Sequence, residues 1–387
     1  MQKDTGSSVR IYNLAKGVAA LGNEVRVVMP KETNISDCIE GVEVYGFRGL
    51  YPKIVLKALK RLVGVARSTS LYFYDLLFIS RVSRLIRESD VVQIEQQTAG
   101  GLLIPFIKIV LKRPVVVDCH DIFQALRVKH TNVMRKFIET FLERLAYRYG
   151  DMVLTVSEKE KEYLVSYGVR KYNIRVIPNG VDTEIFDGSS ESSGIRNRYG
   201  LKGFRTVIFV GNMEYFPNWE AVQLIASEIA PRVLREIKKT KFLIVGRTLK
   251  KIDSSNLFFT DVVDNVAVLL GVSDVAIAPL FHGSGTRLKI LEYFSCGLPV
   301  VSSTVGAEGL DVTDGVDILI ADDVDLFASR VVDLLKDNSL SKKLGKAARD
   351  LVVDKYDWMK VAKKLAILYL GFLAKNRRVQ MKIPMVS

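Results

Sequence analysis

The chain has 387 residues, of which 48% are hydrophobic and 26% are charged, and 56 Lys and Arg against 43 Asp and Glu give a formal net charge of +13. This length fits two domains, and the composition excludes a disordered chain. No apolar run approaches the roughly 20 residues that a membrane-spanning helix needs, and the polar first ten residues do not resemble a signal peptide.

The excess of positive charge is concentrated in the first half of the chain, which favours an anionic partner. Nucleic acid, a phosphorylated ligand and an acidic membrane surface all fit this charge. Nucleic acid is not expected, because the basic and aromatic motifs of the usual RNA-binding modules do not occur. The three cysteines have no zinc-site spacing and are too few to staple two domains. We therefore expect a reducing, cytoplasmic compartment.

The first half alternates helical stretches with β-branched runs. A helix is predicted over residues 8–21, where Ile11, Leu14, Ala15, Val18 and Leu21 recur at helical spacing. Strands are predicted at residues 25–29, 42–47, 91–94, 115–118, 152–156 and 174–177. Alternation of this kind is typical of α/β proteins, in which parallel strands are joined by crossover helices.

The second half repeats this alternation, with strands predicted at residues 207–210, 242–245, 275–278, 299–302 and 318–320. Two such sets predict two Rossmann-like domains. The polar, Gly- and Ser-rich segment 187–204 is the most linker-like, and it places the boundary near 173–200. We expect residues 1–180 to form the first domain, with helix 358–372 packing back on it. Residues 181–357 are expected to form the second domain, and residues 373–387 a basic tail.

The start of the chain is unusual for this class of fold. Gly6-Ser7-Ser8 opens the first helix, and in α/β domains such a turn normally follows a strand. Residues 1–5 do not have a strand pattern. Either a first strand lies upstream of Met1 or the domain is built abnormally, and the first alternative is favoured.

The strongest chemical signal is the segment 282–292, which follows a predicted strand and leads into a helix. Its glycines let the backbone approach a ligand, and a helix N-terminus offers free N–H groups and positive dipole charge to a phosphate. Basic side chains add fixed charge, and a glutamate one turn later can accept hydrogen bonds from sugar hydroxyls. The alternative is a flexible loop with solvated side chains. The candidate residues are Gly283, Ser284, Gly285, Thr286, Arg287, Lys289 and Glu292.

His120 is a second candidate, because it follows the predicted strand 115–118, and ligands bind at the carboxyl ends of parallel strands. A histidine there can donate or accept a proton near neutral pH. The alternative is a histidine that only caps the strand end.

Two further strand–glycine turns, Gly211-Asn212 and Gly246-Arg247, are weaker candidates, since glycine after a strand is common. The turn 177–182 is interpreted as structural. Asp323 and Asp325 have the Asp-x-Asp form of a metal–nucleotide site, but they lie at the start of a predicted helix, where the dipole favours acids. We interpret them as structural and expect no metal.

Residues 53–67 predict a basic amphipathic helix, in which Lys53, Lys57, Lys60 and Arg61 share one face. Such a helix can lie on an anionic bilayer. The alternative is a surface helix whose apolar face packs on its own core.

Taken together, these motifs resemble glycosyltransferase family 4, whose members have the GT-B fold and use nucleotide-sugar donors. The chain resembles the branch with a Gly-x-Gly-x-Arg-x-Lys element, often found in surface polysaccharide pathways. The resemblance extends over most of the chain, through residues 6–12, 118–121, 177–182, 209–218, 245–247, 283–292, 297–301 and 356–358.

The resemblance implies a retaining hexosyltransferase that needs no metal or other cofactor and acts on a glycan or lipid-linked acceptor. The first domain would bind this acceptor and the second the nucleotide sugar. His120 would contact the transferred sugar, Arg287 and Lys289 would hold the diphosphate, and Glu292 the ribose. Gly6 and Ser7 would face the phosphates. Surface polysaccharide or glycoconjugate synthesis on the inner face of the cell membrane is the expected setting.

The sequence departs from the family pattern at two places. Ser284 stands where members commonly carry the first of two glutamates, and Asn212 and Asn218 lie in a stretch where many members place an arginine and a lysine. Two alternatives therefore stay open: a catalytically inactive GT-B scaffold that binds a nucleotide or a partner, and another GT-B enzyme such as an epimerase.

Overall fold

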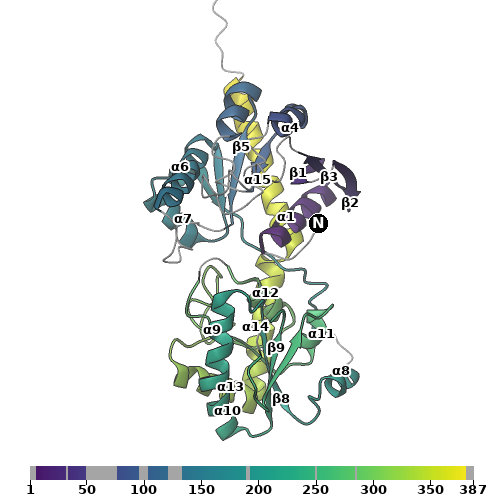
Figure 1. Cartoon of the computed structure of the whole chain (residues 1–387), viewed down its shortest axis with the longest axis vertical. Coiled ribbons are helices and arrows are strands. Elements are labelled where there is room, and N and C mark those ends of the chain that lie inside the picture. The colour runs from purple at the N-terminus through teal and green to yellow at the C-terminus, as the bar shows by residue number, and fades with distance from the viewer. Residues whose placement is uncertain are drawn as a thin grey trace, which may run out of the picture. The chain divides into compact units, whose positions relative to one another are not determined.

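The computed structural model describes residues 6–31, 34–48, 76–95, 103–120, 133–188, 192–248, 251–283 and 286–380. The chain forms two compact units (Figure 1), one comprising Met1–Pro178 with Val361–Ser387 and the other Asn179–Lys360. Helix α15 (Trp358–Gln380) begins in the second unit, and from Val361 onward its residues belong to the first.

The first unit contains a three-stranded sheet in which β1 (Val25–Lys31) pairs with β3 (Val42–Arg48) in parallel. Strand β2 (Ile35–Ile39) pairs with β3 in the antiparallel direction. This hairpin corrects the expectation of a purely parallel arrangement. The turn between β2 and β3 has positive φ at Glu40 (50°) and Gly41 (80°), which is the conformation that two-residue hairpin turns require.

The first unit also contains a four-stranded parallel sheet, in the order β4-β5-β6-β7. Every residue of β5 and β6 is buried, as expected for strands covered on both faces. The bounds are β4 (Val92–Ile94), β5 (Val115–Cys119), β6 (Met152–Thr155) and β7 (Ile174–Val176). The helices besides α15 are α1 (Gly6–Ala20), α4 (Leu76–Glu88), η1 (Ile107–Leu111), α6 (Val133–Tyr149), α7 (Glu158–Ser166) and η2 (Lys171–Asn173).

The second unit is built on a six-stranded parallel sheet in the order β10-β9-β8-β11-β12-β13. The sequence pattern missed β10, an edge strand with only one buried residue. The strands are β8 (Arg205–Val210), β9 (Thr240–Val245), β10 (Leu257–Asp261), β11 (Val275–Ala278), β12 (Val300–Ser302) and β13 (Leu319–Ile320). The helices are α8 (Ser192–Arg198), α9 (Phe216–Leu224), η3 (Ile225–Ile229), α10 (Ala230–Glu236), α11 (Val266–Gly271), α12 (Leu288–Ser295), α13 (Val324–Lys336) and α14 (Asn338–Lys355).

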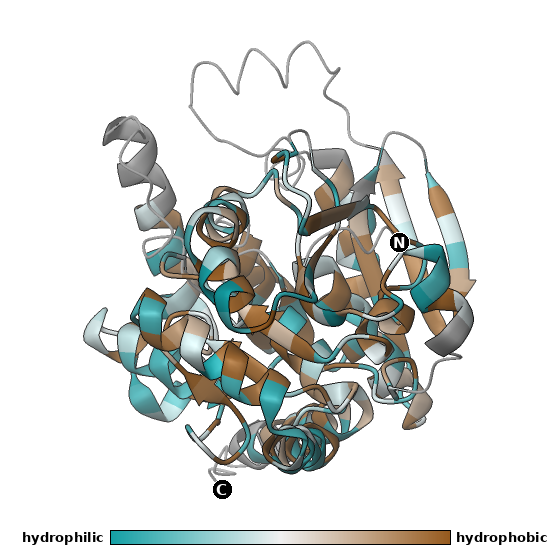
Figure 2. Ribbon diagram, turned by 90° about the horizontal axis from the view of Figure 1, so that it is seen from below, coloured by the Kyte–Doolittle hydropathy of each residue, from teal (hydrophilic) through white to brown (hydrophobic). Residues whose placement is uncertain are grey.

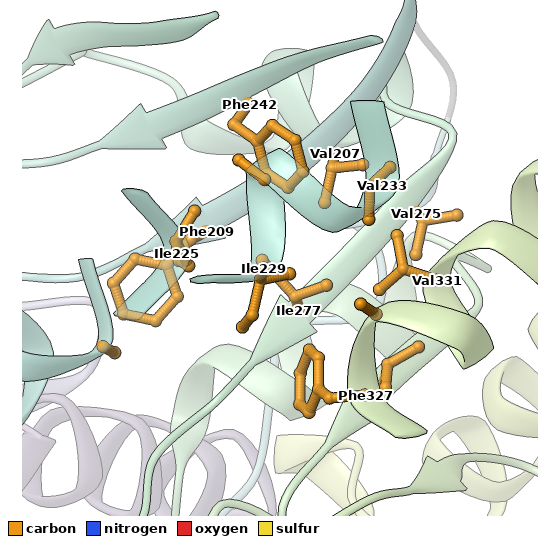
Figure 3. Packing of buried hydrophobic residues seen from close by; sticks show 14 of the residues in the cluster. Val207, Phe209, Ile225, Ile229, Val233, Phe242, Val275, Ile277, Phe327 and Val331 are labelled. Atoms are coloured by element: carbon orange, nitrogen blue, oxygen red, sulfur yellow. The ribbon is translucent and has the colours of Figure 1, made fainter. Parts of the chain in front are cut away.

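The six-stranded sheet has a hydrophobic core on each face. In β8, Val207 and Phe209 belong to one core and Ile208 to the other, because successive side chains of a strand point to opposite faces. Figure 3 shows the first core, where Phe209 and Ile277 of the sheet pack with side chains of η3, α10 and α13. Burial of each large apolar side chain stabilises the fold by about 1.5–3 kcal/mol. In Figure 2 many helices carry both brown, hydrophobic residues and teal, hydrophilic residues, as expected for helices that pack one face on a core.

The turn 177–182 is structural, as predicted. The backbone N–H of Val181 donates to the carbonyl of Tyr356 over 2.9 Å, and the N–H of Trp358 donates to the carbonyl of Val181 over 3.2 Å. A Cβ at Gly180 would lie 2.7 Å from the Tyr356 carbonyl oxygen, so the close approach requires glycine. The turn therefore fastens the start of the second unit to the beginning of α15.

The Asp323 carboxylate is the N-cap of α13 and accepts from the backbone N–H groups of Asp325 and Leu326, each over 2.9 Å. This confirms the interpretation of Asp323 as a helix-start residue. Among the described helices, none is both long enough and apolar enough to cross a membrane. The predicted basic helix with Lys53, Lys57, Lys60 and Arg61 lies outside the described residues.

Candidate active site

In the second unit, the glycine turns after β8 and β9 lie against one another. The N–H of Gly211 donates to the carbonyl of Val245, and the N–H of Met213 to that of Arg247, each over 2.9 Å. Gly246 has φ +125°, and a Cβ there would lie 2.0 Å from the Gly211 carbonyl oxygen. Only glycine fits this contact, which keeps the carboxyl ends of two central strands bare of side chains.

Lys289 of α12 reaches the same edge of the sheet. Its Nζ donates to Oδ1 of Asn218 over 2.8 Å and lies 4.2 Å from the ring centroid of Phe209. A Cβ built on Gly211 would come within 3.0 Å of this Nζ. Helix α12 is held in position by Tyr293, whose hydroxyl accepts from the N–H of Val210 over 2.8 Å. The ammonium group therefore lies directly over the Gly211 turn.

The pKa values of Lys289 and Glu292 both lie near neutral pH. Burial, together with the positive charge of Arg287, lowers the pKa of Lys289 to about 7, although Glu292 partly opposes the shift. Burial raises the pKa of Glu292 to about 7, although Lys289 opposes the shift. An anion bound at this site would stabilise the ammonium form of Lys289, because it supplies the negative charge that burial leaves unmatched.

The loop before α12 supplies the remaining predicted groups. Gly283 has φ +117°, and a Cβ there would lie 2.6 Å from Nη2 of Arg287. Oγ1 of Thr286 is buried and has no hydrogen-bond partner among the described residues. Arg287 is the N-cap residue of α12. These groups, with the first turn of the helix, offer donors to an oxyanion. Ser284 and Gly285 lie outside the described residues.

In the first unit, His120 lies at the carboxyl end of β5 within a buried charge network. Its Nε2 is 2.6 Å from Oε2 of Glu95 and 3.6 Å from Oδ2 of Asp118. Arg10 of α1 donates from Nε and Nη2 to the two oxygens of Asp118, over 3.0 and 3.1 Å. The same guanidinium donates from Nη1 to the carbonyl of Pro178 over 2.9 Å. His120 is thus held by two acids from neighbouring strand ends.

This network favours the charged form of His120. Burial alone would lower its pKa, but the negative charge and hydrogen bond of Asp118, together with Glu95, outweigh burial and raise the pKa to about 10. Burial opposes ionisation of Asp118, yet Arg10 and His120 hold its pKa well below the usual range. His120 is therefore an imidazolium at neutral pH and offers a fixed positive charge with N–H donors.

Glu95, Asp118 and His120 each have a ligand atom within 4.8 Å of the others, and this donor set is one that a metal ion can use. Both Asp118 oxygens already accept from Arg10, whose positive charge would repel a cation. The arrangement favours a hydrogen-bonded ion network. Gln93 extends it by donating to Oδ2 of Asp118 over 3.2 Å. The hydroxyl of Tyr369, on α15, in turn donates to Oε1 of Gln93.

The structure thus groups the predicted residues into two sets. Gly211, Gly246 and Lys289 converge in the second unit, where Asn212 and Arg247 are exposed. His120 belongs to the first unit, as do Gly6 and Ser7, which form the start of α1.

Three residues that contact the candidate groups were not predicted from the sequence. These are Arg10, Glu95 and Asn218. Arg10 had a usable signal, because it lies one turn before Leu14 on the buried face of α1. Leu21, which we expected on that face, is 41% exposed.

Comparison with known proteins decides the family. Residues 5–185 match the model of Glycosyltransferase Family 4, and residues 204–337 match that of Glycosyl transferases group 1. The chain belongs to glycosyltransferase family 4. Among its relatives, this glycosyltransferase is 25% identical over 284 residues to an uncharacterized glycosyltransferase of Methanocaldococcus jannaschii, covering 69% of this chain and 70% of the relative.

A second relative is the GDP-mannose-dependent alpha-(1-6)-phosphatidylinositol monomannoside mannosyltransferase of Mycolicibacterium smegmatis. It is 26% identical over 334 residues, which are 79% of this glycosyltransferase and 84% of the relative. The phosphatidyl-myo-inositol mannosyltransferase of Mycobacterium leprae is 24% identical over 391 aligned positions, covering 97% of this chain and 95% of the relative.

Solved structures establish the fold of this glycosyltransferase. The sucrose-phosphate synthase of Thermosynechococcus elongatus superimposes with a TM-score of 0.73 at 18% identity, covering 96% of this chain and 94% of that one. Anabaena HepE in complex with UDP gives a TM-score of 0.72 at 16% identity, covering 96% and 98%. The fold is GT-B, as predicted, with one Rossmann-like parallel sheet in each unit.

Proposed function

We propose that this glycosyltransferase moves a hexosyl group from a nucleotide-diphosphate sugar to a glycan or lipid-linked acceptor, with retention of anomeric configuration. Cell-surface polysaccharide or glycoconjugate synthesis is its setting. Two observations on other proteins support the choice of donor and acceptor. HepE has been solved with UDP and with UDP-glucose, and two relatives are named for mannosyl transfer to phosphatidylinositol compounds.

The observation that carries the proposal is the position of Lys289 over the bare glycine turn at Gly211. Breaking the bond between the anomeric carbon and a diphosphate places negative charge on the leaving oxygen. Cations and helix N–H groups that are already in place stabilise that charge as it develops. Lys289, Arg287 and the first turn of α12 supply such groups, and Glu292 follows one turn later for the ribose hydroxyls. In this proposal the second unit binds the donor.

His120 has a separate role in the proposal. Its imidazolium, held by Asp118 and Glu95, would contact the transferred sugar, and the N–H group that does not face Glu95 would donate to a sugar hydroxyl. The first unit, which carries His120, would bind the acceptor. Gly6 and Ser7, at the positive end of the α1 dipole, would face the phosphates. The proposed mechanism uses no metal, because Lys289 and Arg287 would neutralise the negative charge of the leaving diphosphate.

The proposal includes peripheral attachment to the inner face of the cell membrane. The basic residues Lys53, Lys57, Lys60 and Arg61, which the sequence predicts on one helix face, support it by charge, each cation contributing roughly 1 kcal/mol near an anionic surface.

The test is a donor panel. Binding and turnover of nucleotide sugars that differ in base and hexose are measured with the purified chain, without added metal and with metal as a comparison. We expect one donor to bind and to be hydrolysed or transferred selectively, with the product in the anomeric configuration of the donor. Failure of every nucleotide sugar to bind would reject the donor site. Binding without turnover, across a panel of glycan and lipid-linked acceptors, would favour the inactive scaffold.

A further inference from the structure

The part of helix α15 that belongs to the first unit has two very different faces. On the inner face, Val361, Ala362 and Leu365 are at most 2% exposed, and Tyr369 donates to Gln93 beside the His120 network. This face packs on the unit and leaves little surface in water. The packing of the inner face therefore fixes the orientation of helix α15, so that its outer face points away from the first unit.

The outer face is exposed and combines apolar with basic side chains. Ile367 is 60% exposed and Leu370 is 65% exposed, and the two lie one turn apart, at positions that share a helix face. At 3.6 residues per turn, the exposed residues between them and around them fall within an arc of about 140°. We call this set the outer face of α15, and it consists of Lys363, Lys364, Ile367, Leu370, Gly371, Ala374 and Lys375.

The charge of this region has one sign. No Asp or Glu occurs after Asp357, whereas Lys363, Lys364 and Lys375 lie on the outer face and Arg377 and Arg378 follow in the sequence. Within the described ranges, none of these three lysines has an acidic group within 4.0 Å. Acidic groups of the described residues therefore do not neutralise these three lysines.

We propose that the outer face of α15 docks on an anionic lipid bilayer. Exposed branched side chains in the middle of a helix face, flanked by lysines that can extend toward lipid headgroups, are the arrangement of helices that lie in a membrane interface. The uniform positive charge selects anionic lipid, each lysine contributing roughly 1 kcal/mol near the surface. A protein partner would need an acidic surface of its own, whereas an anionic membrane supplies that charge uniformly.

The proposal also orients the first unit. Tyr369 lies on the opposite side of the same helix and contacts the His120 network through Gln93. Because a helix with its side chains is about 10–12 Å across, docking would bring this network close to the lipid surface. An acceptor anchored in the membrane would then reach it readily. This last consequence rests on the proposed function, but the docking itself does not.

The test is vesicle co-sedimentation of the full chain with two lipid compositions. Phosphatidylcholine vesicles are compared with vesicles of phosphatidylcholine and phosphatidylglycerol. The first variant, Lys363→Gln with Lys364→Gln and Lys375→Gln, removes the charge. The second, Ile367→Ser with Leu370→Ser, removes the apolar part. The control, Lys342→Gln with Lys343→Gln and Lys346→Gln, removes the same charge from exposed positions of α14 in the other unit.

We expect the chain to bind the anionic vesicles, and binding to weaken by about 100-fold in the charge variant, from three cations of roughly equal weight. The serine variant should bind the anionic vesicles at least about 10-fold more weakly, and the α14 control should bind like the wild type. Circular dichroism and thermal unfolding check that the variants fold. Equal binding by wild type and both variants overturns the proposal. So does a wild-type dimer in solution that the serine variant abolishes, because the face would then be covered by a second copy.

Discussion

Arg10 and Asp118 lie 108 residues apart in the sequence, and the guanidinium Nε and Nη2 donate to the two carboxylate oxygens over 3.0 and 3.1 Å. Both side chains are almost completely buried, at 1% and 0% exposure. The pair joins helix α1 to β5, one of the two central strands of the four-stranded sheet. It also sets the charge around His120, because Asp118 accepts from Arg10 on one side and faces the imidazole on the other.

Arg10→Ala is expected to destabilise the first unit by about 3–5 kcal/mol, because it leaves a buried carboxylate without its counter-charge. Urea unfolding, followed by a probe of the first unit, measures the change. The control is Lys336→Ala, which breaks the solvent-exposed ion pair with Glu236 and should leave unfolding nearly unchanged. If both variants unfold alike, the Arg10 pair does not stabilise the unit.

His120 should stay charged across the neutral range. Its ordinary pKa of 6.5 is raised to about 10, so the folded state holds a proton that the unfolded state releases above pH 6.5. The stabilisation is complete below pH 6.5 and is lost as pH rises through 10. The unfolding free energy should therefore fall between these values in the wild type and fall less steeply in His120→Asn. An NMR titration that finds His120 neutral at pH 8 would contradict this.

Lys289→Ala is expected to lower turnover by about 10²–10³-fold, because it removes one preorganised donor from the leaving group. Thermal unfolding should change little by comparison, since the ammonium contributes more to ligand binding than to packing. His120→Ala should lose less activity than Lys289→Ala. Lys251→Ala, at an exposed lysine paired with Asp261, is the matched control and should retain full turnover. Near-wild-type turnover of Lys289→Ala would contradict the proposed role of Lys289 in stabilising the leaving group.

Nucleoside diphosphate binding should take up protons near neutral pH. With a pKa of about 7, Lys289 is only partly charged in the free protein, and the diphosphate will favour its ammonium form. Calorimetry of UDP binding at pH 7.5, in buffers of different ionisation enthalpy, measures this uptake. Affinity should fall as pH rises above 7. Lys289→Arg should bind without that uptake, because arginine is already charged. Equal uptake by wild type and Lys289→Arg would point to another group, such as Glu292.

Gly246→Ala is expected to destabilise the second unit by at least about 1–3 kcal/mol, the usual range for a strained backbone conformation. Besides its φ of +125°, an added Cβ would collide with the Gly211 carbonyl oxygen at 2.0 Å. Gly194→Ala is the control, since a Cβ there meets nothing within 4 Å. In helix α8 it should be neutral or stabilise by up to about 1 kcal/mol. Urea unfolding of the second unit compares the two, and equal stability would mean that the turn has room to relax.

Local patterns were enough to locate most of the elements of this protein. The central strands of the four- and six-stranded sheets were predicted because they are short, mostly apolar runs that are buried on both faces. β2 and β10 were missed because each is an edge strand with few buried residues, and such strands lack that signal. The candidate residues of segment 282–292 were found because glycine, arginine and lysine occur there at fixed spacing around a helix start.

The partners of those residues were decided only by the tertiary structure. Lys289 binds Asn218, which is 71 residues away, and Tyr369 binds Gln93, which is 276 residues away. The sequence determined that His120 ends a strand and that Lys289 begins a helix, since both follow from local periodicity. It could not determine their charge states, because these depend on burial and on side chains that crossover connections bring from distant strands. Folding alone brings Glu95 to the imidazole of His120 and Arg10 to the neighbouring carboxylate of Asp118.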